Sequence, residues 1–319
     1  MGENAQKIGK KLELLGIDLL GLFGWTEKMR DKEIKCTRTL HKNENGNSKR
    51  THGVDLYMEY FDPYIGKNQG VFIECKNRNW NDITKKKIEY WINEEINLIE
   101  CAKNNKELQD FYSEDSDRNC ALLLINCNDN KYNEEKFYEY LSEIQVQNKK
   151  IPYRVFVAGN SMINKWDAIN RMIKESYHNG IKVLYPSINN SQPITEKYWS
   201  INQLFSKYIF AEAIEIETEE TSDAKITREV KRLVIFAFDI ICADSFQYMW
   251  SICRFYQYEN QYKRIDICFW TESKEEHDYI IENFKSILRG YKDKIDSKIL
   301  ESINLKFLLN RKLNVVDNR

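Results

Sequence analysis

Apolar residues recur at two spacings along this chain, and the spacings predict which segments are helices and which are strands. From about residue 4 to residue 23, leucine, isoleucine and phenylalanine return every three or four positions, which is typical of one face of an amphipathic helix. Two apolar runs follow, Val54 to Phe61 and Val71 to Asn77. The segment between them carries one proline and two glycines, which favour turns. The two runs therefore predict a β-hairpin.

Helices alternate with apolar strands over the next part of the chain. Isoleucines at helical spacing predict a second long helix that starts near Thr84. Helices are also expected at about residues 134–147 and 162–177, and strands at "NCALLLINC", "YRVFVA" and "IKVLYP". This alternation predicts an α/β layer structure.

The length of 319 residues allows two domains. From about Ile214 the sequence "IEIETEETSDAKITREVK" is polar and acidic, and we interpret it as a linker or an exposed connection. We therefore expect one α/β domain at residues 1–216 and a smaller α/β domain, with the order β-α-β-α-β, at residues 217–319. Most aromatic residues between Phe246 and Tyr258 are expected to form the core of this smaller domain. The others are expected to form an interaction surface, for example in a homodimer.

Composition narrows the classes of protein. The formal net charge is −1, so any nucleic acid must be bound by a local basic patch. The eight cysteines form no C-x-x-C pair and lie near no histidine at zinc-finger spacing, which favours reduced thiols in a cytoplasmic protein. No apolar run approaches the roughly 20 residues that span a bilayer, so we expect no membrane segment.

Charged residues stand at the ends of the predicted hairpin. Its first strand begins with Asp55 and its second ends in Glu74-Cys75-Lys76. Residues two apart on a strand share a face, so we expect both carboxylates and the ammonium to converge. Two adjacent carboxylates repel each other unless a divalent cation lies between them. We predict a Mg²⁺ or Mn²⁺ site with Asp55, Glu74 and the backbone carbonyl of Cys75 as ligands; a hairpin with solvated end charges is the alternative.

This arrangement suits phosphodiester hydrolysis, in which Lys76 orients a water molecule or stabilises developing negative charge. The order Gly53-Val54-Asp55 then Glu74-Cys75-Lys76 resembles the PD-(D/E)xK nuclease superfamily, although Val54 replaces the superfamily's proline. Over about residues 5–160 the resemblance implies a restriction-endonuclease-like core of helix, three-strand meander, helix and strand.

Many members of the superfamily carry a glutamate on the first helix that faces the metal, and Glu13 is the matching candidate here. The alternative is a solvated glutamate on an amphipathic helix.

Three phrases, "IGKKLELLGIDLLGLFGW", "KRTHGVDLYMEYFDP" and "IPYRVFVAG", resemble the nuclease-domain subunit of a two-gene bacterial anti-phage defence system. The resemblance implies a metal-dependent DNA endonuclease, with a partner subunit encoded by a neighbouring gene. A different class stays open, namely a non-catalytic DNA-binding or scaffold subunit that retains the nuclease fold.

Basic residues near the predicted site are candidates for contacts with the DNA backbone. Three lysines occupy the first turn of the second helix, where the helix macrodipole favours anions over cations. A phosphate backbone lying there would compensate for that placement. The full set of expected DNA-binding residues is Lys85, Lys86, Lys87, Arg78, Lys49, Arg50 and His52.

Other enzyme classes lack their motifs. The segment "YIGKNQG" misses the first glycine and the hydroxyl residue of a P-loop, and no G-x-S-x-G occurs. The four histidines, His41, His52, His178 and His277, are too dispersed in sequence to indicate a zinc hydrolase.

Overall fold

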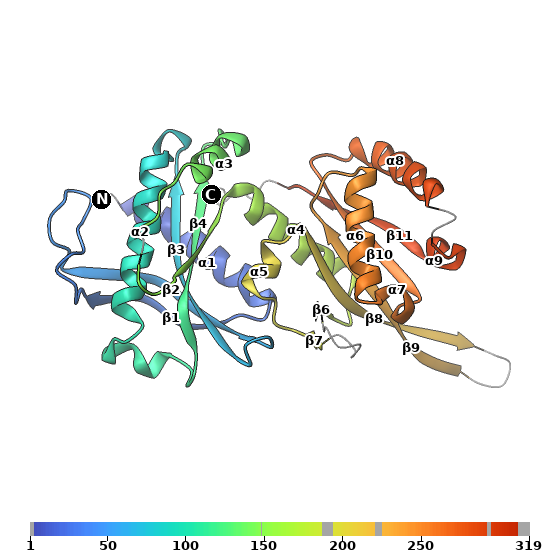
Figure 1. Cartoon of the computed structure of the whole chain (residues 1–319), viewed down its shortest axis with the longest axis horizontal. Coiled ribbons are helices and arrows are strands. Elements are labelled where there is room, and N and C mark those ends of the chain that lie inside the picture. Colours follow the sequence, from blue (N-terminus) through green and yellow to red (C-terminus); the bar gives the residue numbers. More distant parts are fainter. Residues whose placement is uncertain (1–2, 148, 187–193, 221–224, 292–294, 312–319) are drawn as a thin grey trace. The chain divides into compact units, whose positions relative to one another are not determined.

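The computed structural model describes residues 3–147, 149–186, 194–220, 225–291 and 295–311. Their contacts divide them into two compact units, unit 1 within Met1–Asn164 and unit 2 within Lys165–Lys312. Figure 1 shows the elements of both units. None of the helices among these residues is both long and apolar enough to cross a membrane.

The described residues of unit 1 form a five-stranded mixed sheet in the order β1-β2-β3-β4-β5. Strands β1, β2 and β3 are an antiparallel meander, whereas β3, β4 and β5 run parallel. The elements are α1 (Glu3–Leu22), β1 (Thr26–Lys35), β2 (Thr51–Asp62), β3 (Lys67–Arg78), α2 (Lys85–Ala102), β4 (Asp117–Cys127), α3 (Glu134–Ser142) and β5 (Arg154–Ala158). The predicted core of helix, meander, helix and strand is therefore confirmed.

Helices cover both faces of this sheet. On β3, Phe72 packs in one apolar cluster with Leu98 and Ile99 of α2. On the opposite face, Gly16 of α1 lies against Leu124 of β4. Side chains alternate along a strand, so Glu74 and Lys76 project to the same face as Phe72, which is the face that α2 covers. The sequence expectation that Glu74 and Lys76 share a face agrees with this arrangement.

The start of α2 follows from its local sequence. The Thr84 side chain caps the helix by accepting a hydrogen bond from the backbone N–H of Lys87, at 3.3 Å. Buried isoleucines then recur along the helix and pack against Leu123 and Ile125 of β4. This apolar stripe fixes the rotation of α2, and therefore which of its polar residues face the sheet.

The described residues of unit 2 form a six-stranded sheet in the order β11-β10-β9-β8-β6-β7. Its elements are α4 (Asn160–Ser176, beginning in unit 1), β6 (Ile181–Tyr185), β7 (Ile194–Glu196), α5 (Ile201–Leu204), β8 (Tyr208–Glu220), β9 (Lys225–Ala237), α6 (Ala243–Phe255), α7 (Tyr258–Gln261), β10 (Arg264–Thr271), α8 (Glu276–Gly290), α9 (Ser297–Glu301) and β11 (Ile303–Leu309). The order β9, α6, β10, α8, β11 matches the β-α-β-α-β order expected near the C-terminus.

The division between the units falls before β6 and not at the expected boundary of 216/217. The segment interpreted as a linker instead contains the end of β8 and the start of β9, which pair antiparallel with Glu217 opposite Arg228. The nitrogen and oxygen of these two side chains lie 3.0 Å apart. Cross-strand ion pairs of this kind stabilise charged residues along both strands of a hairpin. The polar composition therefore reflects a charged hairpin.

The aromatic residues expected in the core of the C-terminal part divide into two groups. Phe246, Trp250 and Tyr258 are buried in the main apolar cluster of unit 2. Tyr248 and Phe255, in contrast, are 60% and 73% exposed. Most of this set therefore forms the core, as predicted, and the homodimer stays a prediction.

Candidate active site

A pocket of about 230 Å³ lies between the β2–β3 hairpin and α2 in unit 1. Its lining is strongly polar and combines both signs of charge. The acidic lining residues are Asp55, Glu74, Glu94 and Glu95, and the basic ones are Lys49, Lys76 and Arg78. The three residues that the sequence singled out for chemistry, Asp55, Glu74 and Lys76, are thus brought together.

Strand register explains why Asp55 reaches this pocket. The pairing of β2 with β3 runs to Leu56 opposite Ile73, and the next position in register on each strand is Asp55 and Glu74. The Asp55 carboxylate accepts a hydrogen bond from the backbone N–H of Cys75, with 3.1 Å between nitrogen and oxygen. In an extended strand the N–H and C=O of one residue point to the same side, so the Cys75 carbonyl is also directed toward Asp55. The role of that carbonyl as a ligand stays a prediction.

Lys76 lies among these carboxylates and forms an ion pair with Glu74. Burial lowers the pKa of Lys76, and the nearby charges of Asp55 and Glu95 partly oppose that effect. The side chains of Lys76 and Glu74 are only 18% and 15% exposed. Electrostatic interactions in such a site are less screened by water than at the surface.

Glu95 is a fourth ionisable group of the pocket, and the sequence did not single it out. It lies on α2, is 3% exposed, and its Oε2 atom has no hydrogen-bond partner among the described residues. Burial and the Asp55 charge raise its pKa to about 8, while Lys76 and Lys49 act in the opposite direction. The signal was present in the sequence, because Glu95 lies three residues after Ile92 and four before Ile99, within the apolar stripe of α2. A carboxyl in that stripe must face the sheet.

Glu13 of α1 is electrostatically linked to the same region but does not line the pocket. Burial raises its pKa, and the charges of Asp55 and Asp31 raise it further. The proposed metal-facing role of Glu13 remains a prediction.

The structure separates the candidate DNA-binding residues into three groups. Lys49, Arg78 and His52 line the pocket, where Lys49 pairs with Glu94. Arg50 is exposed next to Lys49. His52 is 1% exposed, and burial lowers its pKa to about 4, so the ring is neutral and enclosed. A neutral, enclosed ring does not suit the expected contact with a DNA phosphate.

The three lysines at the start of α2 form the last group, and their surroundings differ. Lys85 lies 3.0 Å from Glu143, and Lys87 lies 3.8 Å from Asp82. Lys86 is exposed and pairs with no acidic group in the part of the chain that the structure describes. Lys86 is therefore the best placed of the three for a new contact.

The sheet order, the acid on β2 and the Glu-x-Lys sequence on β3 define a nuclease-like domain of the PD-(D/E)XK type. The family model described as "GAPS4 protein PD-(D/E)XK nuclease domain" matches residues 1–162, just over half of the chain. The chain therefore belongs to the family of GAPS4 PD-(D/E)XK nuclease domains, a bacterial anti-phage defence family. Neither the curated proteins nor the solved structures gave a significant match. Membership of this family supports a nuclease-type function.

Proposed function

We propose that this protein is a metal-dependent DNA endonuclease that hydrolyses phosphodiester bonds in bacterial defence against phage. One observation carries the proposal: Asp55, Glu74, Glu95 and Lys76 line a single pocket in a domain of a nuclease family. Hydrolysis of a phosphodiester needs a site that tolerates added negative charge, and the ammonium of Lys76 provides positive charge beside the carboxylates.

The donor groups of the pocket fit a hard divalent cation. Asp55, Glu74 and Glu95 supply carboxylate oxygens, and the Oε2 atom of Glu95 is buried without a hydrogen-bond partner among the described residues. Mg²⁺ and Mn²⁺ prefer oxygen ligands of this kind. Asp55, Glu74 and the Cys75 carbonyl would hold the ion, with Glu95 as a further ligand. When bound, such an ion polarises a phosphoryl oxygen and lowers the pKa of a bound water.

The protein's own residues have distinct roles in this proposal. Lys76 holds the attacking water or the developing phosphate charge, because its ammonium donates hydrogen bonds and accepts none. Arg78 at the rim of the pocket and Lys86 at the start of α2 hold the DNA backbone. We place the protein in the bacterial cytoplasm, acting with a partner subunit from a neighbouring gene, and as a possible homodimer through unit 2.

The test is a cleavage assay with the full-length protein on supercoiled and linear DNA, with Mg²⁺, with Mn²⁺, or with a chelator. We expect cleavage only when the ion is present. Lys76→Ala and Asp55→Ala should each reduce the rate by about 100-fold or more, the usual effect of removing one group that stabilises developing charge. Lys285→Ala, an exposed lysine of unit 2, is the matched control and should cleave as the original protein does.

The same variants separate the enzyme from a scaffold. If Lys76→Ala and Asp55→Ala abolish both cleavage and protection of bacteria from phage, the enzyme is supported. If both variants still protect fully, the protein acts as a DNA-binding scaffold. Absence of cleavage by the original protein with either ion, alone and with its partner subunit, would refute the nuclease. Mass measurement in solution that finds only a monomer would remove the homodimer.

A further inference from the structure

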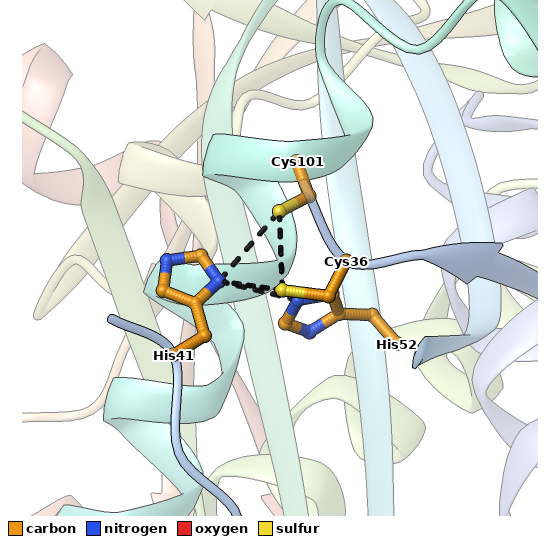
Figure 2. A group of neighbouring side chains, drawn as sticks. All are labelled: Cys36, His41, His52 and Cys101. Carbon is orange, nitrogen blue, oxygen red and sulfur yellow. Dashed lines mark hydrogen bonds between the residues drawn. The ribbon is translucent and has the colours of Figure 1, made fainter. Parts of the chain in front are cut away.

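Two cysteines and two histidines of unit 1 converge on one point outside the carboxylate cluster. They are Cys36, His41, His52 and Cys101, and their ligand atoms all lie within 4.8 Å of one another. Figure 2 shows the four side chains directed toward a common centre. Cys36 directly follows β1, His41 lies in the β1–β2 loop, His52 belongs to β2, and Cys101 lies in the last turn of α2. Chain segments far apart in sequence thus supply one compact group of sulfur and nitrogen atoms.

Four of the six distances between these atoms match the edges of a tetrahedron around zinc, and the other two, from His52 Nε2 to the sulfurs, are within 4.8 Å. With Zn–S of about 2.3 Å and Zn–N of about 2.0 Å, tetrahedral geometry requires about 3.8 Å between sulfurs, about 3.5 Å between sulfur and nitrogen, and about 3.3 Å between nitrogens. The Sγ atoms of Cys36 and Cys101 are 3.9 Å apart. His41 Nδ1 lies 3.3 Å from Cys36 Sγ and 3.6 Å from Cys101 Sγ. His41 Nδ1 and His52 Nε2 are 3.3 Å apart.

Neighbouring groups prepare these atoms to act as ligands. His41 Nε2 lies 3.2 Å from the Glu100 carboxylate, which favours the proton on Nε2 and leaves the lone pair of Nδ1 for the cluster. The backbone N–H and the hydroxyl of Thr37 donate to Cys101 Sγ at 3.5 Å and 3.4 Å. Hydrogen bonds to sulfur stabilise a thiolate, which is the form that binds metal.

We propose that Cys36, His41, His52 and Cys101 bind one structural Zn²⁺ ion. Two thiolates and two imidazoles in tetrahedral arrangement are typical of zinc, and four protein ligands leave no open position for a substrate. The ion fastens the β1–β2 loop to the end of α2. It also fixes His52, three residues before Asp55 on the same strand, so it supports the pocket without taking part in the reaction. The sequence showed no zinc-finger spacing here, because Cys101 joins the group from a helix 49 residues beyond His52.

The first test measures the metal content of tag-free, full-length protein after gel filtration. We expect about one zinc per chain. Cys101→Ser should lose the zinc. Two matched variants should keep it: Cys120→Ala, which removes a buried thiol of β4 outside the cluster, and Asp55→Ala, which disrupts the carboxylate site instead. Zinc that is lost in Asp55→Ala and kept in Cys101→Ser would belong to the carboxylate pocket and would overturn the proposal.

Two further measurements use the unaltered protein, so they hold even if Cys101→Ser does not fold. Replacement of zinc by Co²⁺ should give the strong visible bands of a tetrahedral site and a near-ultraviolet thiolate band. Alkylation followed by mass spectrometry should find Cys36 and Cys101 protected until a strong chelator is added. Protein that contains no zinc and takes none up, or that carries a Cys36–Cys101 disulfide, would refute the site. These outcomes are independent of DNA cleavage, so the zinc site can fail while the nuclease stands.

Discussion

Replacement of Asp266 by asparagine tests how strongly unit 2 depends on one buried carboxylate. Asp266 lies on β10 and is 0% exposed. Four side chains surround its oxygens: Arg232 Nη1 at 2.6 Å, Lys306 Nζ at 2.9 Å, the Tyr177 hydroxyl at 2.9 Å and Asn304 Nδ2 at 3.4 Å. The carboxylate thus joins β9, β10, β11 and the residue after α4 within one unit.

The expected magnitude follows from what the substitution leaves behind. Asparagine keeps the shape and removes the charge, so Arg232 and Lys306 lose their shared counter-ion. Removal of one partner of a buried ion pair costs about 3–5 kcal/mol. Arg232 retains an ion pair with Glu215, and Lys306 is 24% exposed to water, so the low end of that range applies. We expect the free energy of unfolding of unit 2 to fall by about 3 kcal/mol.

Hydrogen exchange resolves this change for unit 2 alone. Amides of β10 should exchange more than about 100-fold faster in Asp266→Asn, because each 1.4 kcal/mol changes the opening equilibrium tenfold. Glu282→Gln, at an exposed pair with Lys285 on α8, is the matched control and should leave β10 unchanged. Equal exchange rates of β10 amides in the two variants would refute the reasoning.

The pH dependence supplies a second check on Asp266. Burial raises the pKa of this carboxyl, but hydrogen bonds from Lys306 and Arg232 outweigh burial, so the pKa lies below its usual 3.8. Because the pKa is lower in the folded state, the contribution of Asp266 to the free energy of unfolding is complete above pH 3.8. It is lost as the pH falls through the folded-state pKa. Acid unfolding of unit 2 should therefore depend less on pH in Asp266→Asn than in the original protein.

Three further outcomes are expected. Glu95→Gln should reduce DNA cleavage yet raise the melting temperature of the metal-free protein. The increase should grow from pH 4.5 to about pH 8, because burial raises the pKa of this carboxyl from 4.5 to about 8. Equal melting temperatures of the variant and the original protein at about pH 8 would contradict this. Lys86→Ala should weaken DNA binding and lower the slope of log affinity against log salt by about 1, measured by fluorescence anisotropy, and an unchanged slope would exclude a phosphate contact. Gly70→Ala should destabilise unit 1 by about 1–3 kcal/mol in urea unfolding, because its Cβ would overlap the buried Tyr57 ring; a neutral result would show that the ring can move.

Local sequence patterns were enough to predict the cluster of Asp55, Glu74 and Lys76, because it depends on strand geometry. The alternation of β2 and β3 and the turn between them are local signals, and they were sufficient to bring Asp55 to Glu74 and Lys76. The contribution of Glu95 depends instead on how α2 rotates as it packs on β4. That packing is a tertiary contact, and only the position of Glu95 within an apolar stripe hinted at it.

Other features could not be predicted from local sequence patterns, because they depend on pairing between distant segments. The paired ends of β8 and β9 are rich in charged residues, and their polar composition indicated a linker because the partners that neutralise them, such as Glu217 and Arg228, lie on opposite strands of the hairpin. Cys36 and Cys101 similarly meet only when the end of α2 docks beside the β1–β2 loop. A spacing rule along the sequence cannot detect ligands that folding brings together from separate elements.

The parallel pairing of β3 with β4, with α2 as the crossover, has a consequence for synthesis of the protein. The ribosome releases the β2–β3 hairpin and α2 before β4, so the part of α2 that packs on Leu123 and Ile125 lacks its apolar partners until β4 has emerged. Until about residue 127 is free, the packing that sets the rotation of α2, and with it the position of Glu95, is incomplete. The complete pocket therefore forms only after β4 has left the ribosome, later than the synthesis of the residues that line it.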